Sequence, residues 1–215
     1  MANSGDGNGG CCKGCCGFIL SSGLTALFIW IGIRAASDPV CSIQDFYVPA
    51  LNKTLNSTTN TSIFFDLELD NKNTDKGIYY NTLNLTFYYN TNGSSIPIAN
   101  QTFAGFYQGH HKKARRMGTV ETTGVPWGEV FRAVSNGSQP VFRVGLVTSF
   151  RFKIWYWKTK KHDLVVGADV AVNGSGEKDD QKGVRLNSGA PEMRCGGGRA
   201  LVIGIVLLIN LVFIS

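Results

Sequence analysis

The 215-residue sequence predicts an all-β protein, an antiparallel sandwich or barrel of about six to eight strands, between two apolar ends. Several segments in the middle of the chain alternate between apolar and polar residues, which is the period of a half-buried strand. Polar turn sequences separate these segments. Outside the apolar ends, no stretch of similar length has apolar residues at helical spacing, so crossover helices are not expected. About 165 residues lie between the ends, enough for one domain.

The chain begins with a leader, residues 1–16, that contains Cys11, Cys12, Cys15 and Cys16 beside a lysine. Cysteines next to a membrane segment and a basic residue are typical S-palmitoylation acceptors, so these four are palmitoylation candidates. Unmodified thiols are the alternative. A four-thiolate zinc site is disfavoured because six consecutive positions cannot wrap four sulfurs around one metal.

Residues 17–33 carry no charge and would form a helix of roughly 25 Å, slightly short of the ~30 Å hydrocarbon core of a bilayer. The sequence favours an uncleaved signal-anchor, an N-terminal transmembrane helix over residues 17–36. A cleaved signal peptide is the alternative, because small residues at 35–37 offer a cleavage site. Single basic residues on either side of the run nearly cancel, so the positive-inside rule does not decide the orientation.

The strands are expected in the extracellular segment, residues 37–187. The first clear strand begins at Ser62, where apolar residues alternate with polar and acidic ones as far as Asp70. Residues 70–77 and 90–95 have the composition of turns. Further alternating segments cover 83–89, 96–103, 141–148, 150–157 and 164–172.

The middle of the chain holds eight Asn-x-Ser/Thr sequons, and none lies in either apolar end. Because such sequons are glycosylated only in the secretory lumen, the middle is expected outside the cytosol and the N-terminus inside it. The glycosylation candidates are Asn52, Asn56, Asn60, Asn84, Asn92, Asn100, Asn136 and Asn173. The first three form the cluster expected to be most exposed.

The C-terminal apolar tail, residues 200–214, would make only about 22 Å of helix, which is short for a span. Small residues at 187–190 and a polar spacer at 191–199 precede it, the pattern of a glycosylphosphatidylinositol signal. We therefore expect GPI attachment at Ser188, or Asn187, and removal of the tail within 188–215. A second spanning helix is the alternative. Only if the tail is retained could Cys41 and Cys195 form a disulfide.

Basic residues are concentrated rather than spread: 112–116 and 151–161 hold nine and no acid. The first set belongs to an expected loop, His110, His111, Lys112, Lys113, Arg115 and Arg116, that could contact acidic pectin, anionic lipid headgroups or an acidic protein. A solvated loop is the alternative. In the second set, Trp155 and Trp157 interleave with lysines and could stack sugars or lipid heads, or pack as cation–π pairs. Nucleic acid is excluded as a partner by the compartment.

The sequence carries no catalytic motif, so we expect no enzyme activity, no cofactor and no metal site. Asp66, Glu68 and Asp70 alternate on one strand face. They could bind a cation, although a solvated strand face is the preferred interpretation.

Four segments, residues 46–52, 66–80, 106–110 and 164–167, resemble the plant non-race-specific disease resistance and harpin-induced-like proteins. The resemblance covers nearly the whole chain. Many members have Asn-Pro-Asn where this chain has Asn71-Lys72-Asn73, a departure that resembles the disease-resistance subgroup. The resemblance implies a late-embryogenesis-abundant type 2 domain, an immunoglobulin-like or fibronectin-like β-sandwich.

The resemblance also implies plasma-membrane residence, glycosylation and a part in defence signalling against bacteria. In that family the cytosolic leader binds a partner of immune receptors, and the outer domain links the membrane to the cell wall. The expected function is therefore a non-enzymatic membrane protein that couples a wall-facing sandwich to a cytosolic immune regulator, with cell-wall polysaccharide as a candidate ligand. The alternative is a stress-protective sandwich that binds lipids or small molecules without a signalling partner.

Overall fold

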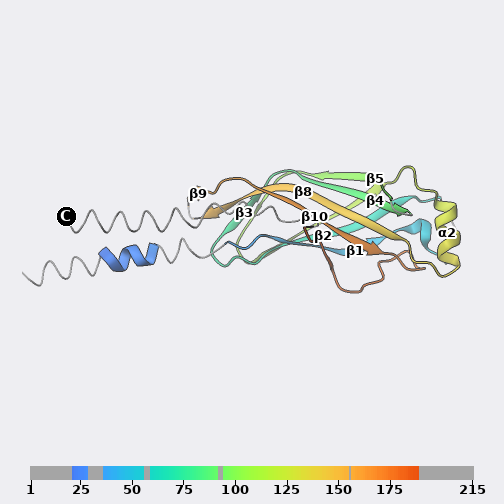
Figure 1. Cartoon of the computed structure of the whole chain (residues 1–215), viewed down its shortest axis with the longest axis horizontal. Coiled ribbons are helices and arrows are strands. Elements are labelled where there is room, and N and C mark those ends of the chain that lie inside the picture. Colours follow the sequence, from blue (N-terminus) through green and yellow to red (C-terminus); the bar gives the residue numbers. More distant parts are fainter. Residues whose placement is uncertain (1–20, 29–35, 56–58, 92–93, 155, 189–215) are drawn as a thin grey trace, which may run out of the picture.

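The structure is a computed structural model that describes residues 21–28, 36–55, 59–91, 94–154 and 156–188 (Figure 1). Residues 21–28 are helical and exposed. Within the described ranges, no helix has both the length and the apolar character that crossing a bilayer requires. The leader cysteines, most of the signal-anchor, the apolar tail and Cys195 lie outside these ranges, so the predictions about them stay predictions.

Residues 36–188 form a mostly-β domain of two antiparallel sheets, which confirms a sandwich-like arrangement. The first sheet has the order β11-β1-β2-β7. The second has the order β5-β4-β8-β3-β6, and β9 and β10 also pair with β8. The bounds are β1 Val40–Tyr47, η1 Pro49–Leu51, β2 Ser62–Asn71, β3 Gly77–Tyr80, β4 Leu83–Thr91, β5 Ser94–Phe103, β6 Tyr107–Gln108, β7 Lys112–Glu121, α2 Trp127–Ser135, β8 Val141–Ile154, β9 Trp157–Lys158, β10 His162–Ala171 and β11 Val184–Arg185.

The core lies between the sheets and is rich in phenylalanine. Ring centroids are 4.9 Å apart for Phe65 and Phe87, and 5.9 Å apart for Phe46 and Phe142. The apolar residues of β2 that the sequence placed on one face are all buried, and the same is true of β4 up to Phe87. Each fully buried side chain of this size contributes about 1.5–3 kcal/mol. Packing of these side chains therefore stabilises the domain, and no disulfide lies among the residues that the structure describes.

Three expectations about elements are wrong. A helix exists: α2 is short and amphipathic, and it buries Trp127, Val130 and Val134 against one end of the sandwich, next to η1. The segments 141–148 and 150–157 are mostly one strand, β8, and Tyr156 is exposed rather than on a buried face. The basic segment is a loop only as far as His111, because from Lys112 it is the edge strand β7. Charged residues are frequent on edge strands, where they discourage pairing with other chains.

The domain has an entry end and a far end, which are formed by different loops and elements. The entry end, where the chain arrives at Ala36, comprises the loops 72–76 and 109–111 and the β8–β9 hairpin. The far end carries η1 and α2, which Figure 1 shows at the opposite side of the domain from β9.

Two asparagines hold the entry end together. The Asn73 side chain exchanges hydrogen bonds of 2.9 and 2.8 Å with the backbone of Ser37. The buried Asn71 amide donates to the carbonyls of Lys76 and Gly109, and its oxygen accepts from Asn73. Lys72 is exposed between them, so its departure from Asn-Pro-Asn leaves this polar clamp intact.

Candidate functional site

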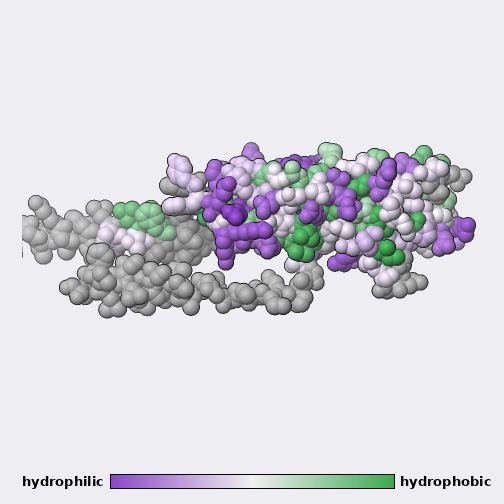
Figure 2. All heavy atoms as spheres, turned by 90° about the horizontal axis from the view of Figure 1, so that it is seen from above, coloured by the Kyte–Doolittle hydropathy of each residue, from purple (hydrophilic) through white to green (hydrophobic). Residues whose placement is uncertain are grey.

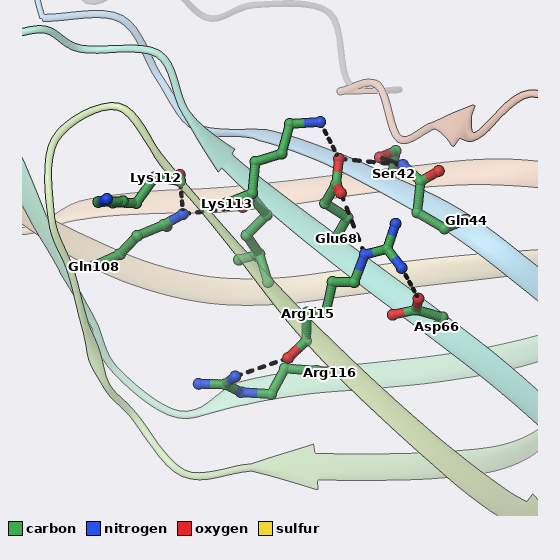
Figure 3. Close-up of polar contacts among 10 residues, drawn as sticks. Ser42, Gln44, Asp66, Glu68, Gln108, Lys112, Lys113, Arg115 and Arg116 are labelled. Atoms are coloured by element: carbon green, nitrogen blue, oxygen red, sulfur yellow. Dashed lines mark hydrogen bonds and ion pairs between the residues drawn. The ribbon is translucent and has the colours of Figure 1, made fainter.

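The structure brings together the acidic strand and the basic segment that the sequence singled out separately. β2 and β7 are antiparallel neighbours, with Glu68 opposite Arg115 and Asp70 opposite Lys113. Lys113 Nζ lies 2.9 Å from Glu68 Oε1, and Arg115 Nε lies 3.4 Å from Glu68 Oε2 (Figure 3). The second nitrogen of the same guanidinium, Nη1, lies 3.4 Å from Asp66 Oδ2. These four side chains form a charge network on the outer face of the first sheet.

The two carboxylates are buried although they lie on an outer face. Side-chain exposure is 5% for Asp66 and 7% for Glu68, against 62% for Lys113 and 53% for Arg115. The long basic side chains lie over the carboxylates and shield them from water. The interpretation of a solvated strand face is therefore wrong for this pair, since their counter-charges come from β7.

A β-bulge in β1 completes the network. The register between β1 and β2 shifts between Ile43 and Asp45, which leaves Gln44 as the extra residue. Its amide nitrogen donates to Glu68 Oε1 at 3.3 Å and to the Ser42 hydroxyl at 2.9 Å. The bulge thus directs an uncharged donor onto a carboxylate that already accepts from two bases, a role that strand periodicity does not predict.

The two carboxyl groups have opposite pKa shifts. The hydrogen bond from Lys113 is the main cause that lowers the pKa of Glu68, and the same bond raises the pKa of Lys113. Burial raises the pKa of Asp66, and the nearby Arg115 offsets this only in part. One oxygen of Asp66, Oδ1, is buried without a hydrogen-bond partner, which fits a carboxylate that is poorly solvated.

Part of the predicted basic contact is already neutralised by this network. Lys113 and Arg115 each pair with a buried acid, and the Arg116 guanidinium lies 4.0 Å from the ring centroid of Phe106. His110, His111 and Lys112 are exposed at the entry end. A contact with an external anion remains a prediction, and it is best supported for these last three residues.

The second basic set packs on aromatic rings, as one of the two interpretations predicted. Lys158 Nζ lies 4.0 Å from the ring centroid of Tyr79, and Lys153 Nζ lies 5.3 Å from that of Tyr107. The two tyrosine rings are 4.6 Å apart. Gly77 permits this packing, because a Cβ there would fall 2.3 Å from the Tyr107 hydroxyl.

Among the hollows on the surface of the described residues, two contain residues discussed above. The larger of these two, about 940 Å³, is lined by residues of β3, β4, β6, β8 and β10, among them Tyr79, Tyr107, Val147 and Val165. The sequon residue Asn84 also lines it, so a glycan there would occupy the hollow. The smaller, about 440 Å³, lies beside the charge network, between Tyr47, Phe64, Asp66 and Met117.

The six sequon asparagines that the structure describes lie outside the loops and the hairpin that form the entry end. Asn60, Asn84, Asn100 and Asn136 are exposed, whereas Asn52 and Asn173 are half-buried. Asn52 Nδ2 donates to the Tyr47 hydroxyl at 3.2 Å. Asn56 and Asn92 lie outside the described residues. Whether any of them is glycosylated stays a prediction.

The residues tied to the predicted anchor occupy distinct environments. Among the described residues Cys41 has no disulfide partner; it is 1% exposed, and burial raises the pKa of its thiol to about 12. Asn187 exchanges two backbone hydrogen bonds with Gly167, each 2.9 Å, and Ser188 is exposed.

Among the described residues, no group of three acidic, histidine or cysteine side chains is placed to hold a metal ion.

No family model matches the chain. In a comparison with individual proteins, Protein NDR1 of Arabidopsis thaliana is 46% identical to it over 186 residues, which cover 84% of each chain. An alignment of this length and identity includes the β domain and extends beyond a single motif.

Proposed function

The chain belongs to the family of plant non-race-specific disease resistance and harpin-induced-like proteins, and from this we infer that it acts in plant disease resistance as a non-enzymatic protein of the plasma membrane. The observation that carries the proposal is the 46% identity to Protein NDR1 over most of both chains. The β domain would be extracellular and glycosylated. The leader would be cytosolic, acylated at its cysteines, and would bind an immune-regulator protein.

An exchange of the leader tests the coupling between the two sides of the membrane. Residues 1–16 are replaced by an unrelated membrane-proximal sequence, and the β domain is left unchanged. Defence output after bacterial challenge should be lost while surface expression persists. A matched variant with serine at Cys11, Cys12, Cys15 and Cys16 separates acylation from partner binding. Full output after the exchange contradicts the proposal.

Adhesion to an acidic wall polysaccharide would use exposed bases. The full-length protein in nanodiscs is tested for retention on polygalacturonate, with Lys112→Glu at the entry end and Arg132→Glu on α2 as a matched pair. We expect Arg132→Glu to reduce retention, because the far end would face the wall. Lys112→Glu should leave retention unchanged, because the entry end would face the bilayer. Lys113 and Arg115 are unsuitable, because changing them would unpair buried carboxylates. Retention that neither salt nor either variant reduces contradicts an ionic contact.

The larger hollow favours a second function, binding of a lipid or small molecule. Its walls include exposed Val147 and Val165 beside tyrosine rings, a surface suited to an amphipathic ligand. In this alternative the leader has no signalling partner, so exchange of the leader leaves protection intact, whereas Val165→Asp abolishes it.

A further inference from the structure

We propose that the entry end of the domain rests on the bilayer surface, with Tyr156 and Trp157 among the lipid headgroups and the surrounding lysines on anionic lipid. The proposal rests on the membrane attachment inferred above, and adds a second, reversible contact made by the folded domain itself. Its ligand is a layer of anionic phospholipid headgroups.

The chain enters and leaves the domain toward the same end. It arrives at Ala36, beside Ser37, which is tied to Asn73 of the entry end. It leaves through β11, which is antiparallel to β1, and the Leu186 N–H donates to the Cys41 carbonyl at 2.9 Å. Because β11 is antiparallel to β1, and β1 runs away from the entry end, β11 brings the chain back toward the entry end. Whichever predicted anchor operates, the entry end is the part of the domain held nearest the membrane.

The β8–β9 hairpin presents two large aromatic side chains at this end. Gly77, the first residue of β3, pairs with Lys153, and β8 continues past it to turn into β9. Beyond that point Tyr156 is 96% exposed and Trp157 is 74% exposed. Among the other aromatic residues described in the domain, only Phe64 and Tyr107 are exposed, at 40% and 46%. Tyrosine and tryptophan combine an apolar ring with a polar group, which suits them to the boundary between headgroups and acyl chains.

Basic side chains surround the hairpin. Lys72, Lys112, Lys158 and Lys160 are exposed, as are the two histidines at 110–111. Two of the acids nearby lie close to lysines, since Asp75 lies 3.3 Å from Lys76 and Asp163 lies 3.9 Å from Lys161, whereas Asp38 is exposed. Figure 2 shows hydrophilic side chains gathered at the part of the domain nearest the N-terminal helix. Clustered lysines attract anionic headgroups, so the set favours anionic lipid.

The sequons avoid this surface. None of the eight lies in the segments 71–77, 104–112 or 153–161 that form it. Asn52 and Asn173 lie near η1, and Asn136 is the C-terminal cap of α2, at the far end. A glycan at the entry end would hold the domain away from the membrane. The absence of sequons from these segments therefore agrees with close contact.

The test uses site-directed nitroxide labels on the full-length chain in vesicles. Serine replaces Cys11, Cys12, Cys15, Cys16 and Cys195, whereas the buried Cys41 is kept because it should not react. One variant carries the label at Tyr156→Cys, and a matched variant carries it at the exposed far-end position Ser138→Cys. Vesicles contain phosphatidylcholine with or without phosphatidylglycerol. We expect the label at 156 to be shielded from a water-soluble nickel relaxant in the anionic vesicles, and the label at 138 to stay fully accessible.

Companion variants separate the two contributions. Trp157→Ser should reduce the shielding of the label at 156. The double variant Lys158→Glu with Lys160→Glu should also reduce this shielding, and only the double variant should abolish the dependence of the shielding on phosphatidylglycerol. Arg132→Glu, an exposed base on α2, should leave it unchanged. Equal nickel accessibility at 156 and 138, in protein that floats with the vesicles, overturns the proposal. Protein that does not float overturns the membrane attachment itself, and with it this contact.

Discussion

At the scale of single residues, Arg115 is the central residue of the charge network, because its guanidinium contacts both buried carboxylates, Asp66 and Glu68. Arg115→Met should destabilise the fold by about 1–3 kcal/mol, since it leaves Asp66 without its counter-charge. For a chain of this size that is a fall of roughly 2–4 °C in melting temperature per kcal/mol. Thermal unfolding in detergent micelles measures it.

Arg116→Met is the matched control for this prediction. The neighbouring guanidinium stacks on Phe106, and an exposed cation–π contact of this kind is worth about 0.5–1 kcal/mol. Equal losses for the two variants would show that Arg115 acts as an ordinary surface residue.

The opposite shifts at Asp66 and Glu68 make a signed prediction about pH. The pKa of Asp66 is higher in the folded than in the unfolded protein, so its ionisation costs stability as pH rises through the folded pKa. Asp66→Asn removes this cost. The variant should therefore gain stability relative to the unmodified protein as the pH rises above the ordinary pKa of an aspartate, and the gain should be absent at more acidic pH.

Glu68→Gln is the counterpart with the reverse sign. Because the folded pKa of Glu68 is lowered, its carboxylate stabilises the fold above the unfolded pKa, and this is lost as pH falls through the folded pKa. Glu68→Gln should lose stability relative to the unmodified protein near neutral pH, with the deficit shrinking toward acid. Melting temperatures across the pH series that change in parallel for both variants would refute the assignment.

The thiol of Cys41 should be inert in the folded protein. It is fully buried, and its pKa is about 12, so little thiolate forms at neutral pH. Iodoacetamide should modify it only after unfolding, without prior reduction. If alkylation of the unfolded protein requires a reductant, Cys41 is in a disulfide, and the retained-tail alternative with Cys195 gains support.

At the scale of elements, the polar clamp of Asn71 and Asn73 is the connection most sensitive to single substitutions. Asn73→Ala would remove two part-buried hydrogen bonds to the Ser37 backbone, each worth about 0.5–1.5 kcal/mol of stability. Lys72→Ala, one residue away and exposed, should change the melting temperature little. Hydrogen exchange should show faster exchange at residues 36–40 in Asn73→Ala alone. Unchanged protection there would show that the clamp does not hold the entering chain.

The strands that alternate cleanly could be predicted, and the elements that depend on tertiary contacts could not. β2, β4 and β10 follow the expected periodicity because each has one face on the core. β7 places Lys113 and Arg115 on its outer face, and its inner positions include Gly118, so composition alone indicated a loop. Its strand conformation depends on pairing with β2. α2 has buried residues at helical spacing but is only nine residues long, shorter than the window of about 11–18 residues in which that spacing can be recognised.

The same limit applies to the candidate site. The acidic strand and the basic run could each be found in the sequence, but their pairing depends on a register that no local pattern specifies. Gln44 enters the network only because of a bulge, and the two asparagines of the clamp act through backbone groups far along the chain. Sequence reasoning identified the charges but could not show that they meet.

At the scale of the whole molecule, the common direction of entry and exit has a mechanical consequence. If both chain ends are fastened to the membrane and the far end is pulled by the wall, tension reaches β1 and β11 together and in the same direction. These two strands then do not slide past each other. Shear falls instead on the longer seam between β1 and β2, where hydrogen bonds along the strands resist it collectively. Such a domain would transmit force between wall and membrane without unravelling from its termini.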